Sequence, residues 1–232
     1  MLNSKKIVLL SKSYLDKFIK IISHELYIQI KDKITIVPNG VHQDYFINRR
    51  GKRNLKKDIN IVSVGRLDKN KNMISLLNLI KSLKGGEKKF KLHIIGDGPE
   101  MSNLINFSKD NEILDDIIFY GKINRKEVIS ILDNSDIFML LSKKETFGIA
   151  YIEALARGLP VIYTQNEGID GYFAPGLVGY PVNPSNLHEI RNSLFKVIDR
   201  YSDISSMSYM QSTQFNWDDI SKIYFKIYQM SY

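Results

Sequence analysis

The sequence predicts a doubly wound α/β fold, in which helices cover both faces of a Rossmann-like parallel sheet. Two observations predict it. Short apolar runs alternate along the chain with longer amphipathic stretches, which is the pattern of repeated strand-helix units. One helix also ends where a strand must begin, because Gly158 suits the positive φ of a helix C-cap and Pro160 follows at once.

The expected strands are short apolar runs, mostly of Ile, Val and Leu. In chain order they span 7–10, 34–37, 59–64, 91–95, 117–120, 137–141 and 160–163. The expected helices are the amphipathic stretches between and after them, at 12–29, 72–83, 100–110, 125–134, 148–157, 187–201 and 217–229. The first strand, helix and strand form an incomplete unit that precedes the longer α/β series.

A basic run divides the chain. Residues 49–57 hold six Lys and Arg and no acid, so they carry +6 of the formal net charge of +8. We expect a linker at 49–58, between an initial piece, 1–48, and the main unit, 59–214. The initial piece is too small to bury a core by itself, which indicates the end of something larger. A helix in 215–232 is predicted to pack back on that piece.

The basic run has two interpretations. Charge blocks of this kind are usually solvated. The alternative is peripheral contact with an anionic membrane surface, worth about 1 kcal/mol for each basic residue held near it. Nucleic acid is not expected as a partner, because no aromatic residues interleave with the run and no nucleic-acid-binding motif accompanies it.

Composition excludes several classes of protein. The 232 residues are 44% hydrophobic and 25% charged, which is ordinary for a folded globular chain. The absence of cysteine excludes disulfides, zinc-thiolate sites and a cysteine nucleophile, and the four histidines lie too far apart for a local metal motif. No apolar run reaches the roughly 18 residues of a membrane span, and no signal-peptide pattern is present, so we expect a cytoplasmic protein.

The most informative stretch is 142–162. Glu145 precedes a predicted helix and Glu153 lies inside it. Open α/β sheets bind ligands beyond the carboxyl ends of their strands, and the backbone N–H groups of 146–149 would face an anion such as a diphosphate. The carboxylate of Glu153 could accept hydrogen bonds from two adjacent hydroxyls, as acidic residues do for ribose. The plainer interpretation is that both glutamates are surface charges.

This stretch closely resembles the Glu-x7-Glu motif of the retaining glycosyltransferases of family 4, which have two Rossmann-like domains in the GT-B architecture. Five further segments resemble that family in its own order. They are Pro-Asn-Gly-Val at 38–41, Gly-Arg-Leu at 65–67 with Lys71, Gly-Asp-Gly-Pro at 96–99, Phe-Tyr-Gly at 119–121 and Phe-Asn-Trp at 215–217. The resemblance covers only the family's donor-binding half. It implies that 59–214 is the nucleotide-sugar donor domain and that 1–48 is the tail of the acceptor domain.

The resemblance implies a role for each matching residue. Arg66 and Lys71 would hold the diphosphate of a nucleotide sugar and stabilise the negative charge that grows as it leaves. Glu145 would hold the donor hexose, and these three are the expected catalytic residues. Glu153 would bind the ribose hydroxyls. Backbone groups would complete the donor site, from Thr146, Phe147, Gly148 and Ile149.

Gly65 belongs to the segment that resembles the family's phosphate-binding Gly-Arg-Leu. The turns after two further strands supply weaker candidates, which are Gly96 and Gly98, then Gly121, Lys122 and Ile123. The turn at 96–98 is more simply structural than ligand-binding. The segment 121–123 would lie beside the nucleobase, or would only close its strand. Asn39 and Gly40 are interpreted as a hinge in preference to a ligand contact.

The activity implied by the resemblance is retaining hexosyl transfer through an oxocarbenium-like transition state. The donor would be a nucleotide sugar, with UDP-hexose as the family's common choice, and the acceptor a glycan or lipid-linked glycan. The pathway would be capsule or lipopolysaccharide assembly at the inner face of the membrane. The resemblance implies no cofactor or metal, because Arg66, Lys71 and the helix at Gly148 would do what a divalent ion does in other transferases. The absence of an Asp-x-Asp metal signature agrees.

The chain also departs from the family. His42 stands where aspartate is usual, the loop 166–173 replaces the usual Gly-Gly-Ile-Pro-Glu, and no glycine-rich acceptor loop precedes Lys5. The alternative function is therefore a non-catalytic nucleotide-sugar-binding subunit that needs a separate acceptor-domain chain. A dinucleotide-binding oxidoreductase is not expected, because the turns at 11–13 and 65–68 lack Gly-x-Gly-x-x-Gly.

Overall fold

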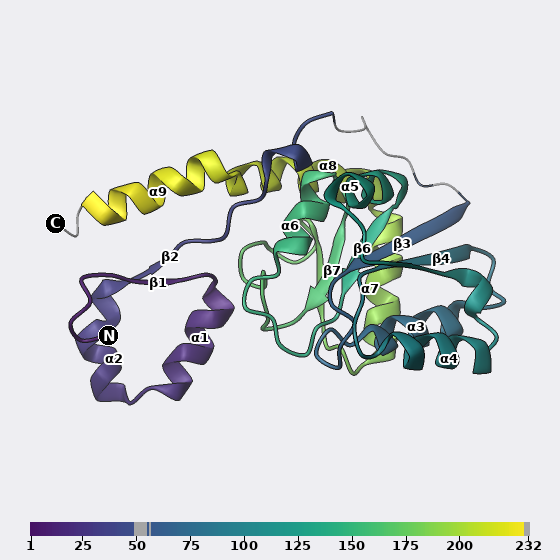
Figure 1. Ribbon diagram of the computed structural model, residues 1–232, viewed down its shortest axis with the longest axis horizontal. Coiled ribbons are helices and arrows are strands. Elements are labelled where there is room, and N and C mark those ends of the chain that lie inside the picture. The colour runs from purple at the N-terminus through teal and green to yellow at the C-terminus, as the bar shows by residue number, and fades with distance from the viewer. Residues whose placement is uncertain (49–54, 56, 230–232) are drawn as a thin grey trace.

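The computed structural model describes residues 1–48, 55 and 57–229. The predicted basic linker, 49–58, therefore lies mostly outside the described residues. In the part of the chain that is described, no helix is long and apolar enough to cross a membrane. A large α/β unit makes up most of the structure, and a small N-terminal piece lies beside it (Figure 1).

Six parallel strands form the central sheet of the large unit. They are β3 (Asp58–Val64), β4 (Lys89–Ile95), β5 (Ile117–Gly121), β6 (Ile137–Leu140), β7 (Val161–Thr164) and β8 (Gly179–Val182). Their spatial order is β5-β4-β3-β6-β7-β8. Every residue of β6 and β7 is buried, which is why these strands are largely apolar rather than alternating.

Helices cover both faces of this sheet, which confirms the predicted fold class. α3 (Met73–Leu83) packs against α4 (Met101–Asp110) and α7 (Leu187–Asp199), and α6 (Ile149–Ala156) packs against α8 (Tyr201–Ser212). Figure 1 shows α3 and α4 below the sheet and α5 and α8 above it.

The strand order reverses at the centre of the sheet. The chain runs outward from β3 through β4 to β5, returns through α5 (Arg125–Asn134), and then runs outward in the other direction from β6 to β8. The loops after β3 and β6 therefore diverge. The crevice between such loops is where open α/β sheets bind ligands.

The N-terminal piece is a two-stranded parallel sheet connected by two helices. Its elements are β1 (Ile7–Leu9), α1 (Lys12–Ile21), α2 (His24–Ile30) and β2 (Ile34–Ile36). The prediction of a single helix over 12–29 is wrong, because Ser23 begins a second helix. Its side chain accepts a hydrogen bond from the N–H of Leu26 at 3.2 Å and so caps α2.

The C-terminal segment crosses the chain that leaves β2. The N–H of Val41 donates to the carbonyl oxygen of Phe215 at 2.7 Å. The ring of Trp217 covers Gly40 so closely that a Cβ there would lie 2.6 Å from a ring carbon. From this crossing, α9 (Trp217–Gln229) extends toward the N-terminal piece (Figure 1). Glycine at the predicted hinge thus makes room for the tryptophan.

Two elements of the large unit, β8 and α8, have no clear sequence pattern. β8 contains Pro181, which is tolerated because this strand lies at the edge of the sheet. α8 is rich in serine. Ser205 Oγ donates to Gly158 O at 2.7 Å, and Ser208 Oγ donates to Ile204 O at 2.8 Å. Hydroxyls with partners can be buried, so the inner face of α8 is not an apolar stripe.

A buried arginine of the large unit binds the chain segment that precedes the linker. Arg157 follows α6 and is 1% exposed. Its guanidinium pairs with both carboxylate oxygens of Asp133 on α5, at 2.7 and 2.8 Å. It also donates to the carbonyl oxygens of Tyr45, Ile47 and Asn48, at 2.7 to 3.1 Å. These contacts use all of its N–H groups.

Arg157→Met is expected to lower the free energy of unfolding by about 3–5 kcal/mol, because it leaves a carboxylate and three carbonyl groups without this partner. Arg157→Lys keeps the charge but not the planar fork, and should recover only part of the loss. Urea denaturation followed by circular dichroism measures both. A loss below about 1 kcal/mol for Arg157→Met would contradict this structural role.

Candidate functional site

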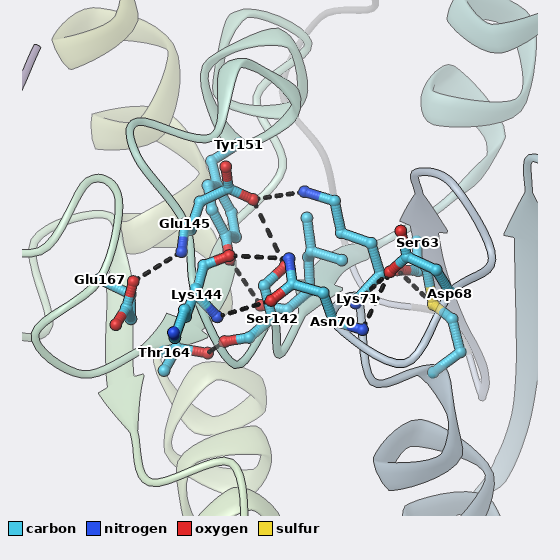
Figure 2. A network of polar contacts seen from close by, with 12 residues as sticks. Ser63, Asp68, Asn70, Lys71, Ser142, Lys144, Glu145, Tyr151, Thr164 and Glu167 are labelled. Atoms are coloured by element: carbon cyan, nitrogen blue, oxygen red, sulfur yellow. Dashed lines mark hydrogen bonds and ion pairs between the residues drawn. The ribbon is translucent and has the colours of Figure 1, made fainter.

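Two loops meet across the crevice between β3 and β6. Lys71 follows β3, Glu145 follows β6, and the Nζ of Lys71 lies 2.5 Å from Oε2 of Glu145 (Figure 2). The two side chains are 22% and 13% exposed, so this ion pair is largely shielded from water. Two of the three predicted catalytic residues are therefore in direct contact.

Polar residues of the first loop hold the second loop in place (Figure 2). Asp68 Oδ1 accepts the N–H groups of Asn70 and Lys71, both at 2.9 Å, which makes a tight turn. The side chain of Asn70 then binds the backbone of Lys144 through both of its polar atoms, at 3.0 and 3.1 Å. Asp68 and Asn70 did not stand out in the sequence, because such residues are common in turns of every kind.

The loop after β6 enters α6 through a left-handed glycine. Gly148 has φ +80°, and a Cβ there would lie 2.4 Å from the ring of Tyr151, so glycine is required. Phe147 is buried against the ring of Phe215, and only its backbone can face the crevice. Within the described residues no hydrogen bond uses the N–H of Gly148 or Ile149. These groups can therefore bind an anion.

A cavity of 270 Å³ lies at the carboxyl ends of β3, β4 and β5. The predicted residues that line it are Gly65, Arg66, Gly96, Lys122 and Ile123. The cavity adjoins the ion pair, because a Cβ on Gly65 would lie 3.6 Å from the side chain of Lys71. The side chain of Arg66 is 73% exposed, so its guanidinium is accessible to a ligand in the cavity.

Two of the predicted glycines have a steric role. A Cβ on Gly96 would lie 1.9 Å from the carbonyl oxygen of Gly65, and one on Gly98 would lie 2.4 Å from that of Leu67. The backbones after β3 and β4 thus cross too closely for any side chain. Gly121 has φ +66° but open space around it. Gly98 and Gly121 do not line the cavity.

Glu153 lies one turn into α6 and has a partner from the N-terminal part of the chain. Its carboxylate faces the hydroxyl of Tyr45, which favours the charged carboxylate. Burial raises the pKa of Glu153, while the Tyr45 hydroxyl and the charge of Arg125 oppose that rise. Arg125 also forms an ion pair with Asp44 at 3.3 Å. No pattern in the sequence identified Tyr45 as a neighbour of Glu153. For Arg125, the one hint was its position just after the candidate segment 121–123.

The predicted residues thus fall into two adjoining groups. Lys71, Glu145 and the start of α6 form one, and the residues that line the cavity form the other. Thr146 turns its carbonyl oxygen toward the N-terminal piece, where it accepts a hydrogen bond from Ser11 Oγ at 3.0 Å. Glu153 lies beside Tyr45 rather than in either group. The arrangement offers cations, a carboxylate and N–H donors to one ligand.

Sequence comparisons find relatives among the glycosyltransferases. The family model described as Glycosyl transferases group 1 matches residues 45–210. A Klebsiella pneumoniae protein, described as an uncharacterised 41.2 kDa protein in the cps region, is 30% identical over 178 residues. The match covers 74% of this chain and 46% of that protein, so this chain spans about half the length of that relative.

Solved structures share the fold. A glycosyltransferase from Rickettsia africae has a TM-score of 0.81 at 19% identity, covering 99% of this chain and 64% of that one. Anabaena HepE, solved in complex with UDP and glucose, has a TM-score of 0.76 at 16% identity, covering 97% of this chain and 62% of that one. The fold is therefore that of GT-B glycosyltransferases.

Glu153→Gln is expected to stabilise the chain at neutral pH. The half-buried carboxylate has a raised pKa, so it favours folding when protonated at acidic pH and loses that contribution as pH rises through its folded pKa. Glutamine can still face the hydroxyl of Tyr45 but never ionises. Melting temperatures of both proteins between pH 4 and pH 8 test this. The variant's advantage should shrink toward acidic pH, and an advantage that does not change with pH would contradict the account.

Gly96→Ala is expected to cost more than about 3 kcal/mol of stability, because the new methyl group collides with the backbone at Gly65. Gly121→Ala is the matched control. Its φ of +66° lies in the left-handed region that an L-residue can reach, whereas φ is +137° at Gly96, and a Cβ at Gly121 meets nothing within 4 Å, so the change should cost only about 1–2 kcal/mol. Denaturant unfolding of both variants compares them, and equal losses would show that the backbone crossing is not tight.

Proposed function

The chain belongs to the glycosyl transferases group 1 family, and we propose that it forms the donor-binding half of a retaining hexosyltransferase of family 4. The observation that carries the proposal is the ion pair between Lys71 and Glu145 at the crevice, next to the N–H groups that begin α6. Phosphate oxygens need positive charge and donors, whereas sugar hydroxyls need an acceptor. A sugar joined to a diphosphate has both requirements.

The proposed donor occupies the crevice in four parts. Its diphosphate lies against Arg66, Lys71 and the N–H groups at the start of α6. Its hexose binds Glu145, and its ribose hydroxyls bind Glu153. The nucleobase enters the cavity beside 121–123, where backbone groups recognise it.

Donor binding exchanges the partners of the ion pair. Without a ligand, Lys71 and Glu145 neutralise each other. The diphosphate takes Lys71, and the hexose hydroxyls take the released carboxylate of Glu145. Neither charge is left buried without a partner, which keeps the cost of desolvation low.

In the proposed reaction, the bond between the anomeric carbon and the diphosphate oxygen breaks, and its electron pair leaves with the diphosphate. Arg66 and Lys71 stabilise the added negative charge. The acceptor oxygen forms the new bond on the same face of the sugar, and its proton passes to the departing phosphate oxygen. The sugar passes through an oxocarbenium-like transition state.

Two relatives support a donor and a setting. The Anabaena structure holds UDP and glucose, and the Klebsiella relative lies in a cps region. We therefore propose a UDP-hexose donor and a glycan or lipid-linked acceptor, in capsule or lipopolysaccharide assembly on the cytoplasmic side of the inner membrane. No metal or other cofactor takes part. Residues 1–48 belong to the acceptor domain, and 59–214 form the donor domain.

The alternative is a non-catalytic subunit that binds a nucleotide sugar and needs a separate acceptor-domain chain. Release of UDP from UDP-glucose by this chain and an acceptor glycan, with no other protein, would exclude a purely binding role.

Glu153→Ala is expected to weaken nucleotide binding by about 10- to 150-fold, because it removes charge-assisted hydrogen bonds to the ribose. Isothermal titration of UDP, GDP and ADP into the wild-type chain first establishes the preferred base. The variant is then titrated with that nucleotide. Unchanged affinity in a folded variant would remove Glu153 from the donor site.

Arg66→Ala is expected to weaken UDP binding at least about tenfold while leaving uridine binding unchanged, because the guanidinium contacts only phosphate. Lys126→Ala is the matched control. It removes one positive charge from the exposed first turn of α5, and should alter neither affinity. Equal effects of Arg66→Ala on UDP and uridine would refute the phosphate role.

A further inference from the structure

The two oxygens of Glu167 connect separate parts of the chain. Oε2 accepts the backbone N–H of Glu145 at 2.6 Å (Figure 2), and Oε1 forms an ion pair with Nζ of Lys17 on α1. The side chain of Glu167 is only 12% exposed. One carboxylate therefore joins the loop of the crevice to a helix of the N-terminal piece.

We propose that Glu167 is a positioning residue, which sets the loop of Glu145 and makes its geometry depend on the N-terminal piece through Lys17. The proposal rests on the donor site described above, in which Glu145 holds the hexose. It concerns residues that do not touch the donor.

The backbone of Glu145 is held on both sides by the segment that carries Glu167. Its N–H donates to the Glu167 carboxylate, and its carbonyl oxygen accepts the N–H of Gly168 at 2.9 Å. Gly168 has φ +51°, and a Cβ there would lie 2.7 Å from the carbonyl oxygen of Phe147. The direction in which the Glu145 side chain leaves the backbone is thus set by 167–168.

Residues that precede Lys17 in the chain bind the loop of Glu145 and the loop of Glu167. Ser11 Oγ donates to Thr146 O and Ser13 Oγ donates to Gly168 O, both at 3.0 Å. The hydroxyl of Tyr172 donates to the carbonyl oxygen of Leu10 at 2.6 Å. The start of α1 is therefore bound to the loop after β6, at Thr146, and to the loop after β7, at Gly168 and Tyr172.

Of these contacts between α1 and the two loops, the one that Lys17 makes is an ion pair. A carboxylate that accepts from an ammonium and an N–H is held more firmly than one with a single neutral donor. If the N-terminal piece moves away from the sheet, Lys17 leaves, and Glu167 keeps only the N–H of Glu145. The loop of Glu145 then becomes more mobile at the position where the hexose would bind.

Three variants separate the two contacts. Lys17→Met removes the ion pair from the side of α1. Glu167→Gln removes it from the other side while keeping an oxygen for the N–H of Glu145. Glu167→Ala removes both contacts. Lys20→Met is the matched control, because it removes the same charge from an exposed position of the same helix.

The first measurement is isothermal titration of the full chain with UDP and UDP-glucose. We expect UDP affinity to stay within about twofold, because Glu167 acts on the hexose side. Affinity for UDP-glucose should fall about twofold to tenfold in Lys17→Met and in Glu167→Gln, and more in Glu167→Ala. The double variant Lys17→Met/Glu167→Gln should be no worse than either single variant, because both remove one interaction.

The second measurement is hydrogen-deuterium exchange over 143–149, which requires no ligand. Exchange should become faster in Lys17→Met and Glu167→Ala but not in Lys20→Met. The proposal is overturned if exchange is unchanged, if Lys20→Met has the same effect, or if UDP and UDP-glucose weaken equally. If the wild-type chain binds neither nucleotide in either measurement of affinity, the proposed function fails, and the exchange rates alone decide whether Glu167 sets the loop.

Discussion

The guanidinium of Arg157 is the interaction on which the arrangement of this chain depends. A charge that is 1% exposed is tolerated only when every donor has a partner, and those partners come from α5 and from residues 45–48. α6 can therefore take its place only together with both. The hydrogen bonds from Arg157 to residues 45–48 also place the hydroxyl of Tyr45 beside the carboxylate of Glu153. A structural arginine thus decides which hydroxyl a candidate ligand-binding carboxylate faces.

Close backbone packing gives the crevice its shape. Glycines let the chains after β3 and β4 cross, and a left-handed glycine turns the chain after β6 into α6. Side chains then project from positions that the backbone has already fixed. The ion pair of Lys71 and Glu145 adds a chemical constraint, since only a ligand with both an anionic and a hydroxyl-bearing part replaces both partners.

Much of the fold could be predicted because burial on both faces leaves a plain apolar signature, as in β6 and β7. The sequence was less informative about secondary structure where hydrogen bonds of serine side chains, rather than apolar burial, determine it. Buried serines of α8 bond to carbonyl groups, and Ser23 starts a new helix inside one amphipathic stretch. In the site, motif resemblance led to Lys71 and Glu145, which are in contact. Tyr45 and Glu167 could not be found in this way, because their roles arise from contacts between distant segments.

Trp217 is the only tryptophan of the sequence, and it lies 46% exposed against Gly40. Indole emission is sensitive to the polarity around the ring, and this ring sits where the chain passes from the N-terminal piece to the large unit. A rotation at the predicted hinge would change the water around the ring. The chain therefore carries an intrinsic optical reporter at the position where a hinge is predicted, which can be read in solution without an attached dye.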